Sequence, residues 1–155
     1  MIFETAKDFA NQLVTNGRLL GIDLGQARIG LATCDATRQI ATPHSVYTRR
    51  NMSQDLGHLN NLCVIEKISG IVIGFPLELN GSEGKNCQQT RHFAKKLYKK
   101  TALPICLVDE RLSTAAVTRA MQESNMTRKK RQSKDDKLAA AYILQGLLDS
   151  LSSTL

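Results

Sequence analysis

The sequence predicts an α/β domain built around one mixed sheet. In the first half of the chain, three strand-like segments follow one another through tight turns, which is typical of antiparallel hairpins. In the second half, two further strand patterns alternate with helical patterns, which is typical of parallel βαβ units. The chain has 155 residues, of which 42% are apolar, so it is long enough for one domain with its own core.

The N-terminal half begins with a short amphipathic helix, which we expect over residues 1–17. Apolar residues recur there at helical spacing and Gly17 ends the pattern; they are Ala6, Phe9, Ala10, Leu13 and Val14. Three strands are expected to follow, over residues 18–25, 28–37 and 39–48. We therefore treat residues 1–17 as a helical extension and residues 18–151 as a single domain.

The second half alternates helices and buried strands. A helix is expected over residues 55–69, and the strand 68–76 is continuously apolar, which indicates burial on both faces. After a polar loop over 77–86 comes a helix with two distinct faces. Its inward residues are Phe93, Ala94, Leu97 and Tyr98, and its outward residues are Lys95, Lys96, Lys99 and Lys100.

The last elements begin with a short strand over residues 105–108. A helix capped by Ser113 or Thr114 is expected next, with Val117, Ala120 and Met121 on its inner face. Residues 125–137 are polar and basic and are interpreted as a loop. The final helix is then expected to start at Asp135 or Asp136 and to end near Leu151.

Charge and cysteine usage limit the function classes. The chain has 21 Lys and Arg against 14 Asp and Glu, a net charge of +7, which favours an anionic partner. No apolar run approaches the roughly 20 residues of a membrane span, and no secretory signal is seen. The cysteines lack the spacing of a zinc site and are interpreted as small buried hydrophobes. A reducing cytoplasm is the expected compartment.

Asp23 is the first candidate site residue. It lies inside an apolar strand, where a carboxylate is costly unless it is paired or binds a cation. Gly25 and Gly30 follow it and leave room for a ligand near the backbone. The alternative is that Asp23 only caps the turn at Gly25–Gln26 through local hydrogen bonds.

Two further acids, Asp109 and Glu110, follow the short strand 105–108. Ligands of open α/β sheets gather at the carboxyl ends of parallel strands. Because strand side chains alternate between faces, at most one of the two acids can join Asp23. The alternative is a local ion pair between Asp109 and Arg111 at the strand end.

Asp135 and Asp136 open the last expected helix, where acids are also favoured simply by capping and by the helix dipole. Seven basic residues accompany them: Arg119, Arg128, Lys129, Lys130, Arg131, Lys134 and Lys137. A cationic loop beside acids suits a site that holds phosphates while carboxylates hold divalent cations. The alternative is that the basic run is only a solvated loop.

Carboxylates from three distant segments favour Mg²⁺ or Mn²⁺ over zinc. Two such ions can flank a phosphodiester, one activating water and the other stabilising the leaving oxygen. The chain has no Trp and only seven Phe or Tyr, so no stacking platform for bases is visible. Recognition of backbone and shape is therefore expected.

Four blocks of the sequence together resemble the YqgF/RuvX family. They are GIDLGQARIGLATCD (21–35), IVIGFPLELNGSEG (71–84), DERLST (109–114) and DDKLAAAYILQGLLD (135–149). Members of this family are described as Holliday junction resolvases and as pre-16S rRNA nucleases with a ribonuclease H-like fold. The match runs from about Leu19 to Asp149, so residues 1–17 lie outside it.

The resemblance implies a five-stranded sheet with three antiparallel and then two parallel strands, flanked by helices. It implies that Asp23 is the acid of the first strand and Asp136 that of the last helix, three residues before Ala139–Ala140. Asp135 stands where the family often carries an apolar residue. The second carboxylate comes from Asp109 or Glu110, and we favour Glu110 because its longer side chain reaches back toward Asp23.

The leading hypothesis is a metal-dependent endonuclease acting on structured RNA or branched DNA, as a monomer or homodimer. In it Asp23, Glu110 and Asp136 bind Mg²⁺ or Mn²⁺. The residues expected to hold the phosphate backbone are Arg28, Arg111, Arg128, Lys129, Lys130, Arg131 and Lys134.

Two alternatives belong to other classes. One is a non-catalytic nucleic-acid-binding factor in ribosome assembly or transcription. The other is a sugar kinase or actin-like ATPase, whose phosphate loop the segment Gly21–Gly25 also resembles. Those proteins clasp nucleotide between two domains, whereas this chain supplies one.

Overall fold

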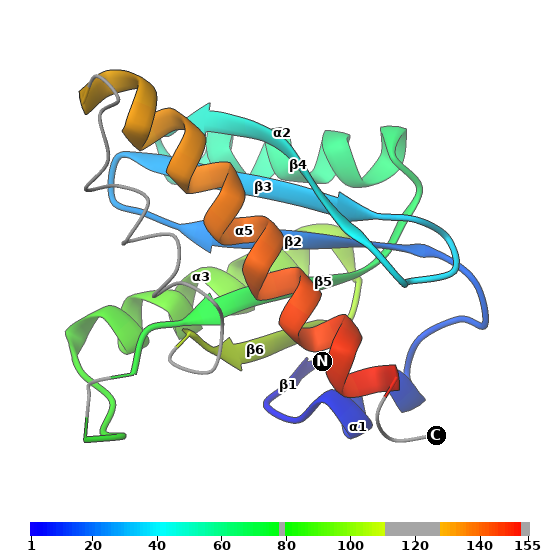
Figure 1. Ribbon diagram of the computed structural model, residues 1–155. Helices are drawn as coiled ribbons and strands as arrows, with labels where there is room; N and C mark the ends of the chain where they lie inside the picture. Colours follow the sequence, from blue (N-terminus) through cyan, green and yellow to red (C-terminus); the bar gives the residue numbers. More distant parts are fainter. Residues whose placement is uncertain (78–79, 111–127, 153–155) are drawn as a thin grey trace.

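The computed structural model describes residues 1–77, 80–110 and 128–152, with side chains described over 1–77, 80–110 and 136–151. These residues form a six-stranded sheet in the order β1-β6-β5-β2-β3-β4, with helices on both faces (Figure 1). The strands are β1 (Ile2–Phe3), β2 (Arg18–Leu24), β3 (Arg28–Cys34), β4 (Ala41–Thr48), β5 (Ile68–Phe75) and β6 (Ile105–Asp109). The helices are α1 (Ala6–Asn11), α2 (Met52–Ile65), α3 (Lys85–Thr101) and α5 (Arg128–Ser152).

The expected strand directions are confirmed. β2, β3 and β4 form antiparallel pairs, and β2, β5 and β6 run parallel. The expected count of five strands is wrong by one, because β1 pairs with β6 through Ile2–Ile105 and Phe3–Cys106. The helix expected over residues 1–17 is confined to Ala6–Asn11. A two-residue edge strand is too short to produce an alternating pattern, so the sequence could not indicate it.

Helix α5 begins earlier than expected. It starts at Arg128, so the part of the expected loop 125–137 that the structure describes is helical. The segment from Arg128 to Lys137 has no Gly or Pro and is rich in Arg, Lys and Gln, which form helices well. Asp136 therefore lies more than two turns inside the helix, not in its first turn. The helix expected after Ser113 or Thr114 lies outside the described residues.

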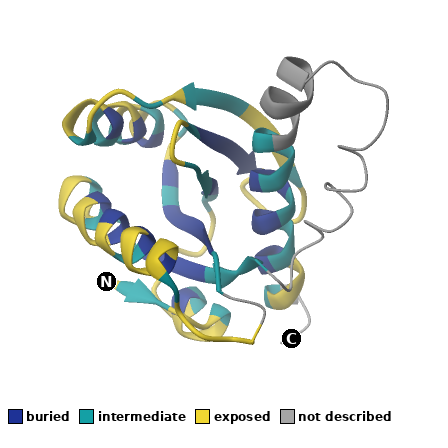
Figure 2. Ribbon diagram, turned by 90° about the vertical axis from the view of Figure 1, so that its left-hand side faces the viewer, coloured by how far each residue is buried: buried dark blue, intermediate teal, exposed yellow. Residues whose placement is uncertain are grey.

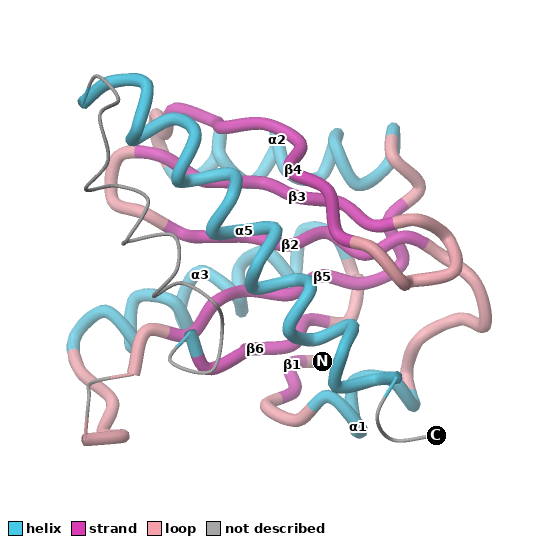
Figure 3. The backbone as a smooth tube through the Cα atoms, viewed as in Figure 1, coloured by secondary structure: helices cyan, strands magenta, loops and turns pink. Residues whose placement is uncertain are grey.

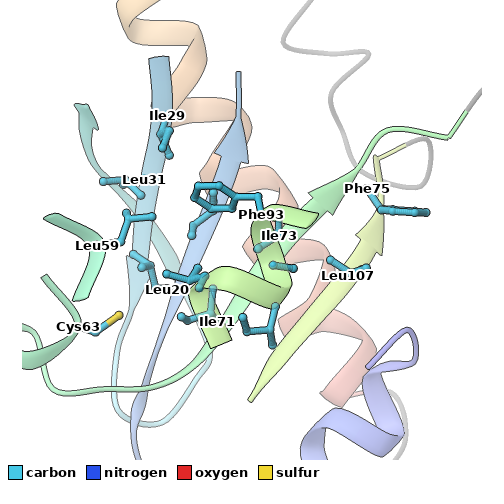
Figure 4. Packing of buried hydrophobic residues seen from close by; sticks show 14 of the residues in the cluster. Leu20, Ile29, Leu31, Leu59, Cys63, Ile71, Ile73, Phe75, Phe93 and Leu107 are labelled. Atoms are coloured by element: carbon cyan, nitrogen blue, oxygen red, sulfur yellow. The ribbon is translucent and has the colours of Figure 1, made fainter. Parts of the chain in front are cut away.

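The two faces of the sheet carry different side chains. Large aliphatic and aromatic residues fill the face covered by α2 and α3, including Leu20, Ile71, Ile73 and Phe93 (Figure 4). The face crossed by α5 is lined by smaller residues such as Ala32 and Cys34, against which the helix packs its own core residues. Figure 2 shows the buried strands between these two helical layers, and Figure 3 follows α5 across the strands.

The cysteines are all buried, as expected of small hydrophobes. Burial raises the pKa of Cys63 and of Cys106 to about 12, which makes both thiols unreactive. In the described part of the chain, no helix combines the length and the apolar character needed to cross a membrane.

Candidate active site

Asp23 lies near the end of β2, opposite Gly30 of β3. The turn that follows is closed by a backbone hydrogen bond, in which Gly25 N donates to Arg28 O at 2.9 Å. Among the described residues, no hydrogen bond to the Asp23 carboxylate is seen, so the alternative that this acid caps the turn is not supported. The half-buried carboxyl group is instead influenced by the charges of two other acids, Glu110 and Asp136.

The structure brings Asp23, Glu110 and Asp136 into one neighbourhood. Burial, and then the negative charges of Glu110 and Asp136, raise the pKa of Asp23 to about 7. The three come from β2, from the end of β6 and from α5. They are neighbours without forming an assembled ligand set, because the described residues contain no group of three Asp, Glu, His or Cys side chains that could hold a metal ion as it stands.

Of the two adjacent acids at the end of β6, Glu110 is the one near Asp23. A Cβ added to Gly74 of β5 would lie 2.5 Å from Glu110 Oε1, so the side chain of Glu110 crosses that strand. Glu110 also lines the cleft beside Asp23. Asp109 is paired with Phe75 at the end of β6, and strand alternation directs it to the opposite face. Arg111, its expected ion-pair partner, lies outside the described residues.

Asp136 is positioned by a side chain and by a backbone contact. Arg28 Nε donates to Asp136 Oδ2 at 2.7 Å, in an ion pair whose members are 35% and 25% exposed. A Cβ added to Gly30 would overlap the backbone oxygen of Asp136. Only glycine at position 30 therefore lets α5 approach β3 closely enough to place this acid beside Asp23.

A cleft of about 740 Å³ opens beside Asp23 and Glu110. Sequence reasoning missed most of its polar lining, which comes from the segment after β4 and from α3: Arg49, Arg50, Asn51, Asn86, Gln89 and His92. The only signals were the Arg-Arg-Asn run after a strand and the polar first turns of a lysine-rich helix, and neither indicates a site by itself.

One wall of the cleft is fixed by a buried ion pair. Asp55 of α2 is 1% exposed and accepts hydrogen bonds from Arg49 Nε at 3.0 Å and from Arg50 N at 2.9 Å. Burial alone would raise the pKa of Asp55, but these hydrogen bonds lower it below its usual value. Arg49 also donates to Gly25 O at 3.0 Å, and its guanidinium lies 5.5 Å from the ring centroid of Phe93. This network ties the turn after Asp23 to α2 and α3.

Several predicted cationic residues lie outside the described side chains. Arg111 belongs to a segment that is not described, and the backbone of Arg128–Lys134 forms the first turns of α5. Asp135 follows in the same helix, and its side chain is likewise not described. The roles predicted for these residues therefore stay predictions.

Comparison with known proteins identifies the family. The model of the RuvX family, described as a Holliday junction resolvase, matches residues 17–150. The chain belongs to this family. A relative from Anaplasma marginale is 44% identical over 149 residues, which cover 96% of this chain and 95% of that one. A relative from Paramagnetospirillum magneticum is 50% identical over 137 residues and 87% of each chain. Both bear the name "Putative pre-16S rRNA nuclease".

Solved structures confirm the expected fold. Thermus thermophilus RuvC in complex with a Holliday junction substrate is 11% identical, with a TM-score of 0.55 over 88% of this chain and 97% of that one. The fowlpox virus resolvase in complex with its Holliday junction DNA is 10% identical, with a TM-score of 0.51 over 86% and 98%. At these identities the likeness concerns the fold, which is the ribonuclease H-like arrangement of a mixed sheet between helices.

Proposed function

We propose that the protein is a metal-dependent endonuclease that hydrolyses phosphodiester bonds in structured nucleic acid. Its catalytic carboxylates are Asp23, Glu110 and Asp136. The observation that carries this proposal is the environment of Asp23, whose pKa is raised by burial and by two neighbouring acids. Ionising such a carboxylate at neutral pH requires free energy, because the charge is buried beside two other negative charges. A bound cation would offset this free energy.

The residues present fit a divalent cation. Three carboxylates supply the oxygen ligands that Mg²⁺ and Mn²⁺ prefer, and Gly30 and Gly74 keep bulky side chains away from them. When bound, such ions activate water and stabilise the leaving oxygen of an in-line displacement. Asp23 holds the central position, Glu110 extends across β5, and Arg28 orients Asp136. Because the described acids are neighbours rather than a gathered set, their side chains would have to move together to hold an ion.

The cleft beside the acids is the proposed path of the substrate strand. Arg50, which makes no salt bridge to a described carboxylate, brings positive charge to it, and Asn51, Asn86 and Gln89 bring hydrogen-bonding groups suited to phosphate and sugar. We further propose that Arg28, Arg111 and the run Arg128–Lys134 contact the phosphate backbone. Contacts of this kind position a nucleic acid without reading its sequence.

The proposed substrate is the 5′ end of pre-16S rRNA, processed during ribosome biogenesis in the cytoplasm. The names of the relatives favour this substrate, and the sequences of these relatives align with nearly the whole chain. A Holliday junction is the second substrate, favoured by the description of the family. A junction resolvase cuts two strands symmetrically and so needs a two-fold dimer, whereas a monomer suffices for the RNA.

A second candidate function is that of a nucleic-acid-binding factor without catalysis, acting in ribosome assembly or transcription. The observation that favours it is that the described residues hold no gathered set of three metal-binding side chains. The net charge of +7 favours binding of nucleic acid equally for a nuclease and for a non-catalytic factor.

The proposal is tested by offering both substrates to the purified protein with Mn²⁺ or Mg²⁺, alongside Asp23→Asn. We expect this variant to lose cleavage by at least about 10²-fold, as when a principal electrostatic contributor is removed, while most of the binding remains. Asp8→Asn, at an exposed acid of α1, is the matched control and should cleave like the wild type. Undiminished cleavage by Asp23→Asn would remove the mechanism. Binding by the wild type without product under either ion would establish the second function.

Cation binding has its own readout. Mn²⁺ or Mg²⁺ should raise the melting temperature of the wild type, because a ligand at 100 times its Kd stabilises the folded state by about 2.7 kcal/mol. Asp23→Asn should show a much smaller rise, and Asp8→Asn the full one. Equal rises in all three proteins would place the cation elsewhere.

A further inference from the structure

Helix α3 carries positive charge without any compensating acid of its own. Its 17 residues include six Lys or Arg and no Asp or Glu. The side turned to the core is formed by Cys87, Thr90, Phe93, Ala94 and Leu97. The lysines are all exposed, and Figure 2 shows exposed residues along the outer side of the helices at its left.

Five exposed residues of α3 lie along one line of the helix surface. At about 100° per residue, the side chains spaced three and four apart fall within about 40° of a common direction. We call this line the basic ridge; its members are Lys85, Gln89, His92, Lys96 and Lys99. At a rise of about 1.5 Å per residue the ridge is about 21 Å long, and Lys95 and Lys100 flank it.

The charge of the ridge is not neutralised within the described part of the molecule. Arg91 stands on another side of the helix, where it binds Glu83 at 2.8 Å and Glu4 at 2.6 Å. None of the α3 lysines makes a salt bridge to a described carboxylate. The helix dipole favours cations at the C-terminal turn and so accounts for Lys99 and Lys100. It does not account for Lys85 or Lys96, which lie at the first turn and in the middle of the helix.

The ridge is continuous with the candidate active site. Gln89 and His92 belong to it and also line the cleft that contains Asp23 and Glu110. From His92 the ridge continues along the outer side of α3 to Lys96 and Lys99, away from the acids. A polyanion whose scissile strand lies in the cleft therefore meets a row of unneutralised cations directly beyond it.

We propose that the basic ridge binds the phosphate backbone of a double-helical arm that flanks the cleavage site. This inference rests on the proposed function. A ridge of 21 Å spans about six base pairs along the axis of a duplex, at roughly 3.4 Å each. It carries no aromatic side chain other than a histidine and so suits a regular duplex better than splayed single-stranded bases. The ridge would favour substrates in which the cut lies next to a helix.

The test measures binding of labelled RNA by the cleavage-inactive Asp23→Asn protein. One RNA has a duplex arm of about twelve base pairs beside the cleavage site, and the other has an arm of about three, too short to span the ridge. The ridge variant is Lys96→Gln/Lys99→Gln. The matched control is Lys7→Gln/Lys67→Gln, which removes the same charge from two exposed lysines on α1 and at the end of α2, outside the cleft and the ridge.

With the long arm, the ridge variant should bind about tenfold more weakly than the control near 0.15 M salt, and the slope of log K against log salt should fall by about two. With the short arm, the two variants should bind alike. Equal binding of the long-arm RNA by both variants would contradict a role of the ridge in binding the duplex arm, while leaving the proposed function intact. If Asp23→Asn with no other change binds neither RNA, both proposals fail together. Equal melting temperatures of the two variants would confirm that the difference is not one of folding.

Discussion

Two acids that line the same cleft show how differently a fold can treat a buried carboxylate. Asp55 is 1% exposed and accepts hydrogen bonds from Arg49 and from a backbone N–H, which lower its pKa despite its burial. Asp23 has two further acids as its electrostatic neighbours, and its pKa is raised to about 7. The first acid is satisfied by the chain itself. For the second, the described residues provide two negative neighbours and no salt bridge.

The largest effect is expected from Asp55→Asn. Removing the charge leaves Arg49 without its buried partner, and breaking a buried pair costs about 3–5 kcal/mol of unfolding free energy. Urea unfolding near pH 7 measures the loss, and Asp8→Asn at an exposed position is the control. Because the pKa of Asp55 is lowered in the folded state, its contribution is present above the ordinary carboxyl pKa and is lost as the pH falls through the folded value. A change under about 0.5 kcal/mol, typical of surface sites, would contradict the structural role.

Asp23→Asn is expected to raise the free energy of unfolding near neutral pH, by less than Asp55→Asn lowers it. The folded protein binds the Asp23 proton more tightly than the unfolded chain, so stability falls as the pH rises from about 4 to above 7. The rise of this pKa from 3.8 to about 7 corresponds to about 4 kcal/mol, and we expect about half of that because water reaches part of the carboxyl group.

The variant should therefore be more stable than the wild type at pH 8 by about 2 kcal/mol, and nearly equal to it at about pH 4. Urea unfolding at the two pH values, with divalent cations removed by a chelator, measures the difference. A destabilised variant at pH 8 would show that Asp23 is held by stabilising contacts, as Asp55 is.

Gly30→Ala tests how Asp136 reaches Asp23. The added Cβ overlaps the backbone oxygen of Asp136, so α5 has to shift, at a cost of about 1–3 kcal/mol and with a loss of cleavage. Gly146→Ala in the same helix is the control, because its Cβ meets nothing within 4 Å. That change should stabilise the protein by about 0.5–1 kcal/mol. Equal stabilities of the two variants would contradict the inference that α5 lies too close to β3 to admit a side chain at position 30.

The smallest effect on stability is expected from Arg28→Gln. The ion pair with Asp136 is partly exposed, and such pairs contribute up to about 1 kcal/mol. Cleavage should nevertheless fall, because Asp136 loses the group that orients it, and Mn²⁺ affinity followed by calorimetry should change with it. Unchanged Mn²⁺ affinity together with unchanged cleavage would remove Arg28 from the site.

Local patterns in the sequence predicted most of the fold. The hairpins from β2 to β4 follow from strand patterns and tight turns, and the two faces of α3 follow from its helical period. β1 could not be predicted, because two residues show no period. The start of α5 was misplaced, because a run of charged residues was taken for a loop although its Arg and Lys residues favour a helix.

The candidate site was only partly predictable for a different reason. Asp23 stood out because a charge in an apolar strand is costly wherever the strand lies. Glu110 was favoured over Asp109 by side-chain length, whereas strand alternation and the contact at Gly74 are what bring it to Asp23. The polar lining of the cleft comes from segments that meet only in three dimensions, and no local pattern marks Arg49 or Gln89 as neighbours of Asp23.

The contact between α5 and β3 also bears on how far this protein can change its sequence. At Gly30 the close approach is to the backbone of Asp136, and no side chain takes part in it. Exposed side chains of α5 can therefore be exchanged without altering this contact, whereas its buried residues hold the helix on the sheet. A slip of α5 by one residue would rotate Asp136 by about 100° and move it about 1.5 Å along the axis. The backbone contact at Gly30 thus fixes the position of Asp136 relative to β3, while the exposed surface of the helix tolerates substitution.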